Sequence, residues 1–574
     1  MEAASGETLT SSLDLAKNNW ASITMGYSEA YCHLCGVSFN IARHRKPGEP
    51  ELATYSSTDG MAAEFEDIEL EECIKTGCTL VVKDSYKEEN DLINDPDYEP
   101  ADDDDVDDEP YEYDSQYDSG DEMSVSGDED DSDGATDDEN DTYIEFLARS
   151  VRNQPRTPGE PVGAFAFSPN TKQHDTLIPI TSDEIPEGYE PDQLEHIPSS
   201  TCRQAQAYAG ANISMIEMRG CRTAQFLVHK SSTKKGKWKP DGFNEDWELK
   251  EDWFLSGIAD GMESRDCGYP TVWPARGGVA VVQTDNINFD PRYTSGTDLA
   301  MPFHPWCFDI FSRQSKAQFG GKVNVSGLMQ WRDAESSYEQ FHAFPRIADV
   351  LEAREQWWDH MPDREYLAAN PLYVPGLPAL LRSAASGDGL IGYKSSSATT
   401  SPDRGEDRLG SLPMDLRLYI ISFLDSNDIS SLRAASRAFT QLPNSVWYKL
   451  VRKEMPWLWE AWDEREVEHT PSFWTTITAN EIKYIDEIRK SYGKILKQDH
   501  KGDEGILDYL FPRSDGVPEQ MKLPRASTNW HAVFTAIKGN WDKLKGLRNR
   551  QRIWEDVEEV ISRIRKYEEV TTDG

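Results

Sequence analysis

The clearest pattern of hydrophobic and polar positions along the chain lies between Leu412 and Trp459. In its first part, apolar residues recur three and four positions apart, which is the spacing of one face of an α-helix. These residues are Leu416, Tyr419, Ile420, Phe423 and Leu424. Two further short runs of the same kind follow, and Pro443 opens the second of them. The pattern therefore predicts three short helices.

Helices of this length do not fold alone and need tertiary packing. The residues expected to point inward from the second and third helices are Ile429, Leu432, Ala435, Val446, Trp447, Leu450 and Val451. Together with the first stripe they cover more surface than one small three-helix core requires. We therefore expect part of this apolar surface to contact a partner protein.

This stretch resembles the F-box of substrate receptors in cullin–RING ubiquitin ligases. The resemblance rests on Leu412-Pro413, Asp415-Leu416, Ile420, Phe423-Leu424, Asp428, Leu432, Ala435-Ser436-Arg437 and Trp447. It implies docking onto a Skp-type adaptor, which links the receptor to a cullin. The adaptor-binding residues that it implies are Leu412, Pro413, Leu416, Ile420, Leu424, Leu432 and Trp447.

The remaining patterns predict an α+β multidomain protein. Short strand-like runs such as ISMIEM, RTAQFLVHK and GGVAVVQTDN give way to helical patterns from His304 onward, which indicates a mixed α/β central module. Further helical patterns cover about 480–496 and Trp530 to Tyr567, the latter with breaks expected at Gly539 and Gly546. The predicted divisions are an N-terminal CxxC segment (1–85), an acidic disordered segment (86–148), the α+β module (195–382), a flexible linker (383–407), the F-box (408–460) and a helical C-terminal region (461–574).

The acidic segment dominates the charge of the chain. The net charge is −44, and 28 Asp and Glu fall between Glu88 and Ala148 with no Lys or Arg among them, so the rest carries −16. A segment with so few apolar residues cannot offset its chain entropy by burial, and we expect it to be disordered. The acidic balance argues against general nucleic-acid binding.

Eight scattered cysteines, no secretory pattern at the N-terminus and no long apolar run predict a cytoplasmic or nuclear protein without a membrane span. The sequence contains no GxxxxGK, GxSxG or HExxH motif, and no cysteine is paired with an obvious base. We therefore expect a non-catalytic protein. The basic stretch around Trp530 and Trp541 is interpreted as helix core rather than as a nucleic-acid site.

Metal binding is the chemistry that the sequence favours. Cys32-x2-Cys35 followed by Gly36 is typical of one half of a tetrahedral zinc site. The second half could be Cys73 with Cys78, His196 with Cys202, or His304 with Cys307. His304 and Cys307 are preferred, because residues three apart in a first helical turn share a side. The prediction is one structural zinc held by Cys32, Cys35, His304 and Cys307, across an insertion of 268 residues.

The chain as a whole resembles F-box proteins common in filamentous fungi, through YCHLCGVSF, HPWCFDIF, the F-box, EMPWLW and LKGLRNRQRIW. The resemblance implies a substrate receptor of a Skp–cullin–F-box ligase that holds an unknown substrate protein. Two alternatives stay open: an F-box scaffold that works outside a ligase, and a zinc-dependent protein or nucleic-acid interaction module. Cullin in a purified complex would separate the ligase receptor from the scaffold. Metal content and salt-sensitive nucleic-acid binding would test the interaction module.

Overall fold

We describe the fold from a computed structural model of the chain. The residues that the structure describes are 31–49, 53–54, 70–82, 176–181, 186–190, 193–203, 207–231, 238–240, 244–260, 276, 300–335, 344–352, 360–385, 408–462, 469, 471–476 and 521–573. The predicted acidic disordered segment and the helical pattern at about 480–496 lie outside them.

The central module is built on a three-stranded antiparallel sheet in the order β7-β6-β8. The strands are β6 (Thr223–His229), β7 (Trp253–Asp260) and β8 (Met301–Phe303). Six of the seven residues of β6 are buried, because both faces of this strand are covered by other parts of the chain. A mixed module of strands and helices is therefore confirmed. The run ISMIEM, however, forms turns instead of the predicted strand.

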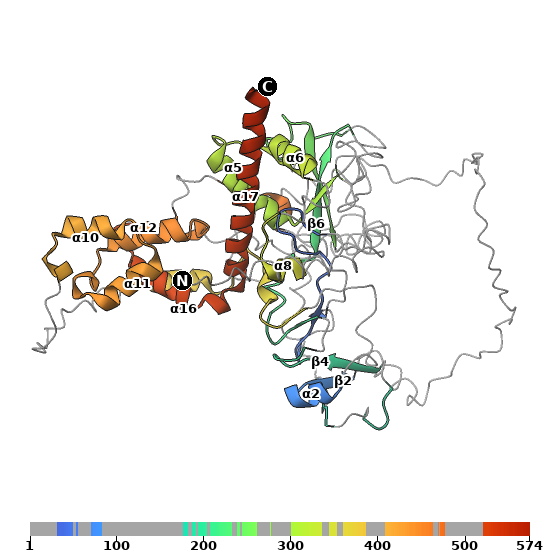
Figure 1. The fold of residues 1–574 in the computed structure, drawn as a ribbon. Coiled ribbons are helices and arrows are strands. Elements are labelled where there is room, and N and C mark those ends of the chain that lie inside the picture. Colours follow the sequence, from blue (N-terminus) through green and yellow to red (C-terminus); the bar gives the residue numbers. More distant parts are fainter. Residues whose placement is uncertain are drawn as a thin grey trace, which may run out of the picture.

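Helices cover this sheet and continue into the C-terminus. The chain leaves β8 directly into α5 (Pro305–Gln318), and α6 (Val325–Ala334) follows. The long helix α17 (Lys545–Asp573) packs against both of them (Figure 1). Short elements join these parts: α8 (Ala348–Glu352), η8 (Glu365–Ala368) and α13 (Phe473–Thr476). The apolar face of α17 supplies Leu547, Ile553, Val557, Val560 and Ile564 to the core.

The three predicted helices of the F-box-like stretch are present as α10 (Met414–Ile421), α11 (Ser426–Ala435) and α12 (Asn444–Glu454). Short 3-10 turns lie around them: η10 (Arg408–Ser411), η11 (Arg437–Phe439) and η12 (Trp459–Ala461). Figure 1 shows this helical unit extending from one side of α17, away from the β7-β6-β8 sheet. Ile429 is buried as expected, but Ala435 is exposed, because α11 turns only part of its predicted face inward.

The helical unit is joined to the rest by α16 (Trp530–Gly539), which packs against α12 and against α9 (Leu377–Ala385). α9 runs three residues past the predicted start of the linker. The predicted break at Gly539 is confirmed: η14 (Trp541–Lys543) separates α16 from α17. Gly546 instead lies in the first turn of α17, where a Cβ would come 2.3 Å from the carbonyl oxygen of Asn370. Gly546 therefore permits close packing and does not interrupt the helix.

A small lobe lies apart from the main sheet (Figure 1) and contains α2 (Leu70–Thr76), β2 (Thr79–Val82), β3 (Leu177–Pro179) and β4 (Leu194–Ile197). Beside it, β1 (Arg43–His44) pairs in parallel with β5 (Tyr208–Ala209). None of the described helices combines the length and apolar character that crossing a membrane requires.

Candidate metal centres

The Cys32–Gly36 stretch forms a tight knuckle. The amide of Gly36 donates to the carbonyl of Cys32 at 2.7 Å, and the amide of Cys32 donates to the carbonyl of Val37 at 2.9 Å. Gly36 has a φ of +74°, which side chains other than glycine rarely adopt. A Cβ there would also lie 2.7 Å from the side chain of Arg346. The glycine that the motif supplies is thus required by both backbone conformation and space.

The start of α5 supplies the second pair of donors. His304 is the residue before the helix, and Pro305 occupies its first position, where the missing N–H has no cost. The amide of Cys307 donates to the carbonyl of His304 at 2.8 Å, which closes the first turn. The amide of His33 donates to the carbonyl of Pro302 at 3.0 Å and so ties the knuckle to β8.

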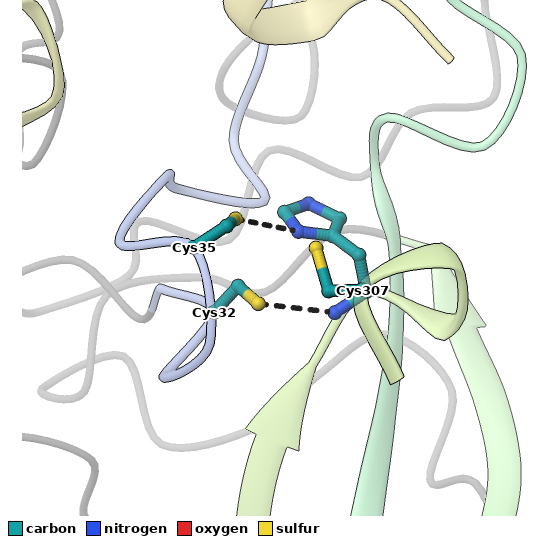
Figure 2. A group of neighbouring side chains, drawn as sticks. Cys32, Cys35 and Cys307 are labelled. Atoms are coloured by element: carbon teal, nitrogen blue, oxygen red, sulfur yellow. Dashed lines mark hydrogen bonds between the residues drawn. The ribbon is translucent and has the colours of Figure 1, made fainter. Parts of the chain in front are cut away.

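The structure brings Cys32, Cys35, His304 and Cys307 together as one buried group, with all four donor atoms within 4.8 Å of one another. Figure 2 shows Cys32, Cys35 and Cys307 with their sulfurs turned toward one another. The Nδ1 atom of His304 lies 3.5 Å from Cys35 Sγ. A tetrahedral zinc with bonds of about 2.3 Å to sulfur spaces its ligands about 3.8 Å apart. These donors are therefore suited to a structural metal such as zinc.

Groups around the four donors fix their orientation. The Nε2 atom of His304 lies 3.0 Å from the carbonyl oxygen of Cys221, which favours a proton on Nε2 and leaves Nδ1 free to bind metal. The backbone amide of His304 donates to Cys32 Sγ at 3.4 Å (Figure 2). An N–H donor of this kind stabilises the thiolate form of a cysteine ligand.

Two buried arginines bind the backbone carbonyls of the knuckle. Arg346 donates to the carbonyls of His33 and Leu34 at 2.9 and 3.1 Å, and Arg552 on α17 donates to the carbonyl of Cys35 at 2.7 Å. Both arginines also pair with the buried carboxylate of Asp556, at 3.0 and 3.2 Å. The C-terminal helix is thereby fastened to the N-terminal cysteines.

The three thiols of this group differ in acidity. Burial raises the pKa of Cys32 and of Cys307. Burial also acts to raise the pKa of Cys35, but hydrogen bonds from the Cys307 and Cys32 thiols bring it well below its usual range. A metal with three thiolate ligands would therefore displace protons as it binds, and its affinity would fall with acidification.

The other two candidate pairs do not complete the Cys32 half-site. Cys73, Cys78, His196 and Cys202 form a second buried group of their own, with donor atoms within 4.8 Å of one another. The structure therefore contains two groups suited to a structural metal where the sequence predicted one, because β2 and β4 pair and bring these two halves to each other. The spacing within each pair is visible in the sequence, but no local pattern indicates that Cys73 and Cys78 belong with His196 and Cys202.

The residues predicted to bind an adaptor occupy two environments. Pro413 and Leu416 are exposed, whereas Leu412, Ile420, Leu424 and Leu432 are half-buried. Trp447 is buried: its ring centroid lies 4.4 Å from that of His531 and 5.7 Å from that of Phe534, both on α16. Two residues outside the predicted set are the most exposed apolar side chains here, Tyr419 at 64% and Phe423 at 68%. The sequence signal that could have identified Tyr419 and Phe423 was their position in the apolar stripe of the first predicted helix.

Comparisons with known proteins show no family. No family model matches the chain, and no solved structure matches it significantly. A stretch of 68 residues is 55% identical to part of the mitochondrial ATP-dependent RNA helicase mss116 of Aspergillus oryzae. The match covers 12% of this chain and 11% of that protein, so most of both proteins lies outside it.

Proposed function

We propose that this protein is a non-catalytic F-box substrate receptor. In this proposal, α10 and α11 dock a Skp-type adaptor of a cullin-based ubiquitin ligase, and the mixed α/β module holds a substrate protein. The observation that carries the proposal is an apolar face on and beside α10, which the described parts of the chain leave largely exposed. We call this the α10 face and define it by Leu416, Tyr419, Ile420 and Phe423, with Leu412 and Leu424 at its ends.

The α10 face is unusual for a helix in a folded protein. Of the eight residues of α10, only Ile421 is buried, although six of the eight are large apolar side chains. The rings of Tyr419 and Phe423 pack edge to face at 4.9 Å and form a continuous apolar surface. Contiguous exposed apolar surface of this kind marks an interaction site more often than chance exposure.

The helices behind the α10 face are rigidly attached, which is what a receptor that positions a substrate requires. Trp447 packs its ring into α16, and Asn444 accepts from the amide of Trp530 at 3.0 Å. Glu460, just beyond the F-box-like helices, forms a buried pair with Arg550 of α17 at 2.6 Å. The α10 face is thereby presented outward at a fixed position relative to the module.

The cysteines that the structure describes support a receptor over a ligase that forms a thioester. The seven cysteines among the described residues are all buried and none is in a disulfide. Six of them belong to the two Cys3His groups. A catalytic thiolate needs an accessible and electropositive setting. We assign Cys32, Cys35, His304 and Cys307 to a structural zinc with four protein ligands, which leaves no open position for catalysis.

The helicase match does not redirect the proposal, since this chain lacks the GxxxxGK[ST] loop that cradles nucleotide phosphates. The proposal includes a cytoplasmic or nuclear location for the protein, where it could assemble with a cullin-based ligase. The substrate stays unnamed, because no described feature identifies its chemistry.

The test is affinity purification of the full chain from its own cells, with and without a proteasome inhibitor. We expect an adaptor and a cullin to co-purify, and a substrate to accumulate with the inhibitor. A Leu416→Ala/Phe423→Ala variant should lose the adaptor and the cullin together. Adaptor without cullin would favour a scaffold outside a ligase, and the absence of both would overturn the proposal.

A further inference from the structure

The small lobe is assembled from two distant parts of the chain. β2 lies between β3 and β4 and runs antiparallel to both, with Val81 opposite Leu177 and Leu80 opposite His196. The chain between β2 and β3, residues 83–176, includes the whole acidic segment. The two ends of that long insertion therefore meet side by side at one sheet.

The hydrophobic core of the lobe is too small to explain how it folds. Among the described residues it consists of six buried ones, Cys73, Cys78, Leu80, Ile180, Leu194 and Cys202, with Ile74, Val82 and Ile178 packed at its edge. Three of the six are cysteines. Protein units with so little buried apolar surface usually need a metal or disulfides to be stable.

The donors of the lobe come from both parts of the chain. α2 carries Cys73 and ends at Thr76, and the following Gly77, with a φ of +76°, turns the chain so that Cys78 returns to the same point. The amides of Gly77 and Cys78 both donate to the carbonyl of Cys73, at 2.9 and 3.0 Å. From the other part, β4 supplies His196 and the turn that follows supplies Cys202.

The four donors are arranged as metal ligands. All are buried, their donor atoms lie within 4.8 Å of one another, and His196 Nε2 is 3.4 Å from Cys73 Sγ. The amide of Ser199 donates to Cys78 Sγ at 3.3 Å, and the hydroxyl of Thr76 lies 3.3 Å from the same sulfur. Three sulfurs and one imidazole suit zinc, and they exclude hard cations such as magnesium, which prefer oxygen.

We propose that Cys73, Cys78, His196 and Cys202 hold a second structural zinc ion, which folds the small lobe and joins the two ends of the acidic insertion. The two metal sites are then nested along the sequence, since each takes one pair of ligands from before the acidic segment and one pair from after it. This inference does not depend on the proposed adaptor binding. It concerns only how the N-terminal part of the chain is held.

The second site also explains how the lobe is held against the rest of the protein. Glu195, the neighbour of His196 on β4, pairs with Arg45 at 2.8 Å and accepts from Thr54 at 2.9 Å. Arg45 directly follows β1, which pairs with β5 of the central module. A metal that fixes β4 against β2 therefore fixes the position of the Glu195 carboxylate as well.

The experiment measures the zinc content of the purified full chain by elemental analysis and native mass spectrometry. We expect two zinc ions per wild-type chain and no disulfide. Cys73→Ser and Cys307→Ser should each retain one ion, and the double variant none. Cys267→Ala is the matched control, because Cys267 is in neither of the two Cys3His groups, and it should keep both ions.

The wild-type spectrum decides the matter even if a variant fails to fold. A wild-type chain with a single zinc that Cys307→Ser abolishes would overturn the second site. A disulfide among Cys73, Cys78 and Cys202 with no second metal would overturn it too. Full zinc content in Cys73→Ser would show that the donors have been assigned incorrectly.

Discussion

Removing the two exposed anchors of the α10 face tests the proposed docking most directly. Leu416 is 51% exposed and Phe423 is 68% exposed in the free chain, so each still has more than half of its side chain to bury in a complex. Full burial of such a side chain contributes about 1.5–3 kcal/mol. The exposed portions should thus contribute about 1 kcal/mol from Leu416 and about 1.5 kcal/mol from Phe423.

These contributions predict that Leu416→Ala/Phe423→Ala weakens adaptor binding by about 2.5 kcal/mol, or roughly 60-fold in Kd. The assay is calorimetric or interferometric titration of the full chain with purified adaptor. The midpoint of thermal unfolding should change less than the affinity, because each side chain is more exposed than packed in the free protein. A loss of affinity larger than the loss of stability is the expected signature.

The matched control is Leu249→Ala/Val570→Ala. These two side chains are similarly exposed, at 55% and 73%, but lie outside the α10 face. The control should bind the adaptor like the wild type. If the Leu416→Ala/Phe423→Ala protein is folded and binds with unchanged affinity, the α10 face is not the docking surface and the reasoning from exposure is wrong.

Three further predictions concern stability and metal. Because thiolate and imidazole ligands must be deprotonated to bind zinc, acidification should release metal and lower the unfolding midpoint, as elemental analysis after buffer exchange would detect. Gly36→Ala should destabilise the protein by at least about 1 kcal/mol and weaken zinc retention against a chelator, since φ is +74° and the new Cβ would meet Arg346; Gly48→Ala, with positive φ but open space, is its control. Burial and the charge of Glu248 raise the pKa of Glu245 from 4.5 to about 7, so the folded state is penalised as pH rises between those values. Glu245→Gln should therefore stabilise the protein by about 1 kcal/mol more at pH 8 than at pH 6, and a constant difference in denaturant melts would contradict this assignment.

Local patterns in the sequence predicted the parts of the fold that local interactions determine. The three helices α10, α11 and α12 appear where the apolar spacing placed them, and His304 and Cys307 share one side of a first helical turn. The Trp-rich C-terminus is core, as its helical spacing indicated: Trp530 is fully buried and lies 5.1 Å from the ring of Tyr448.

The predicted group of Cys32, Cys35, His304 and Cys307 is confirmed as a cluster, but the pairing of Cys73 and Cys78 with His196 and Cys202 was beyond local patterns. The entropy of closing a loop grows only with the logarithm of its length, so separations in the sequence hardly distinguish one partner from another. The choice is made by strand pairing, because β4 lies beside β2 and carries His196 to Cys78. Trp447 is a second case in which a local pattern does not identify the contact. A tryptophan in an apolar helix stripe can face a partner protein or another helix of the same chain, and here the position of α16 places Trp447 against Phe534.

The first metal centre and the α10 face are connected through one helix. Arg552 of α17 donates to the carbonyl of Cys35, and Arg550, two residues earlier, donates to both carboxylate oxygens of Glu460 at 2.6 and 2.7 Å. Both contacts are buried, and removal of one partner from the buried Arg550–Glu460 ion pair costs about 3–5 kcal/mol. Zinc at the knuckle would therefore stabilise α17, and α17 in turn anchors the segment that follows the F-box-like helices. Under the proposed function, this rigid path is what would keep a substrate on the module at a constant distance from an adaptor on α10.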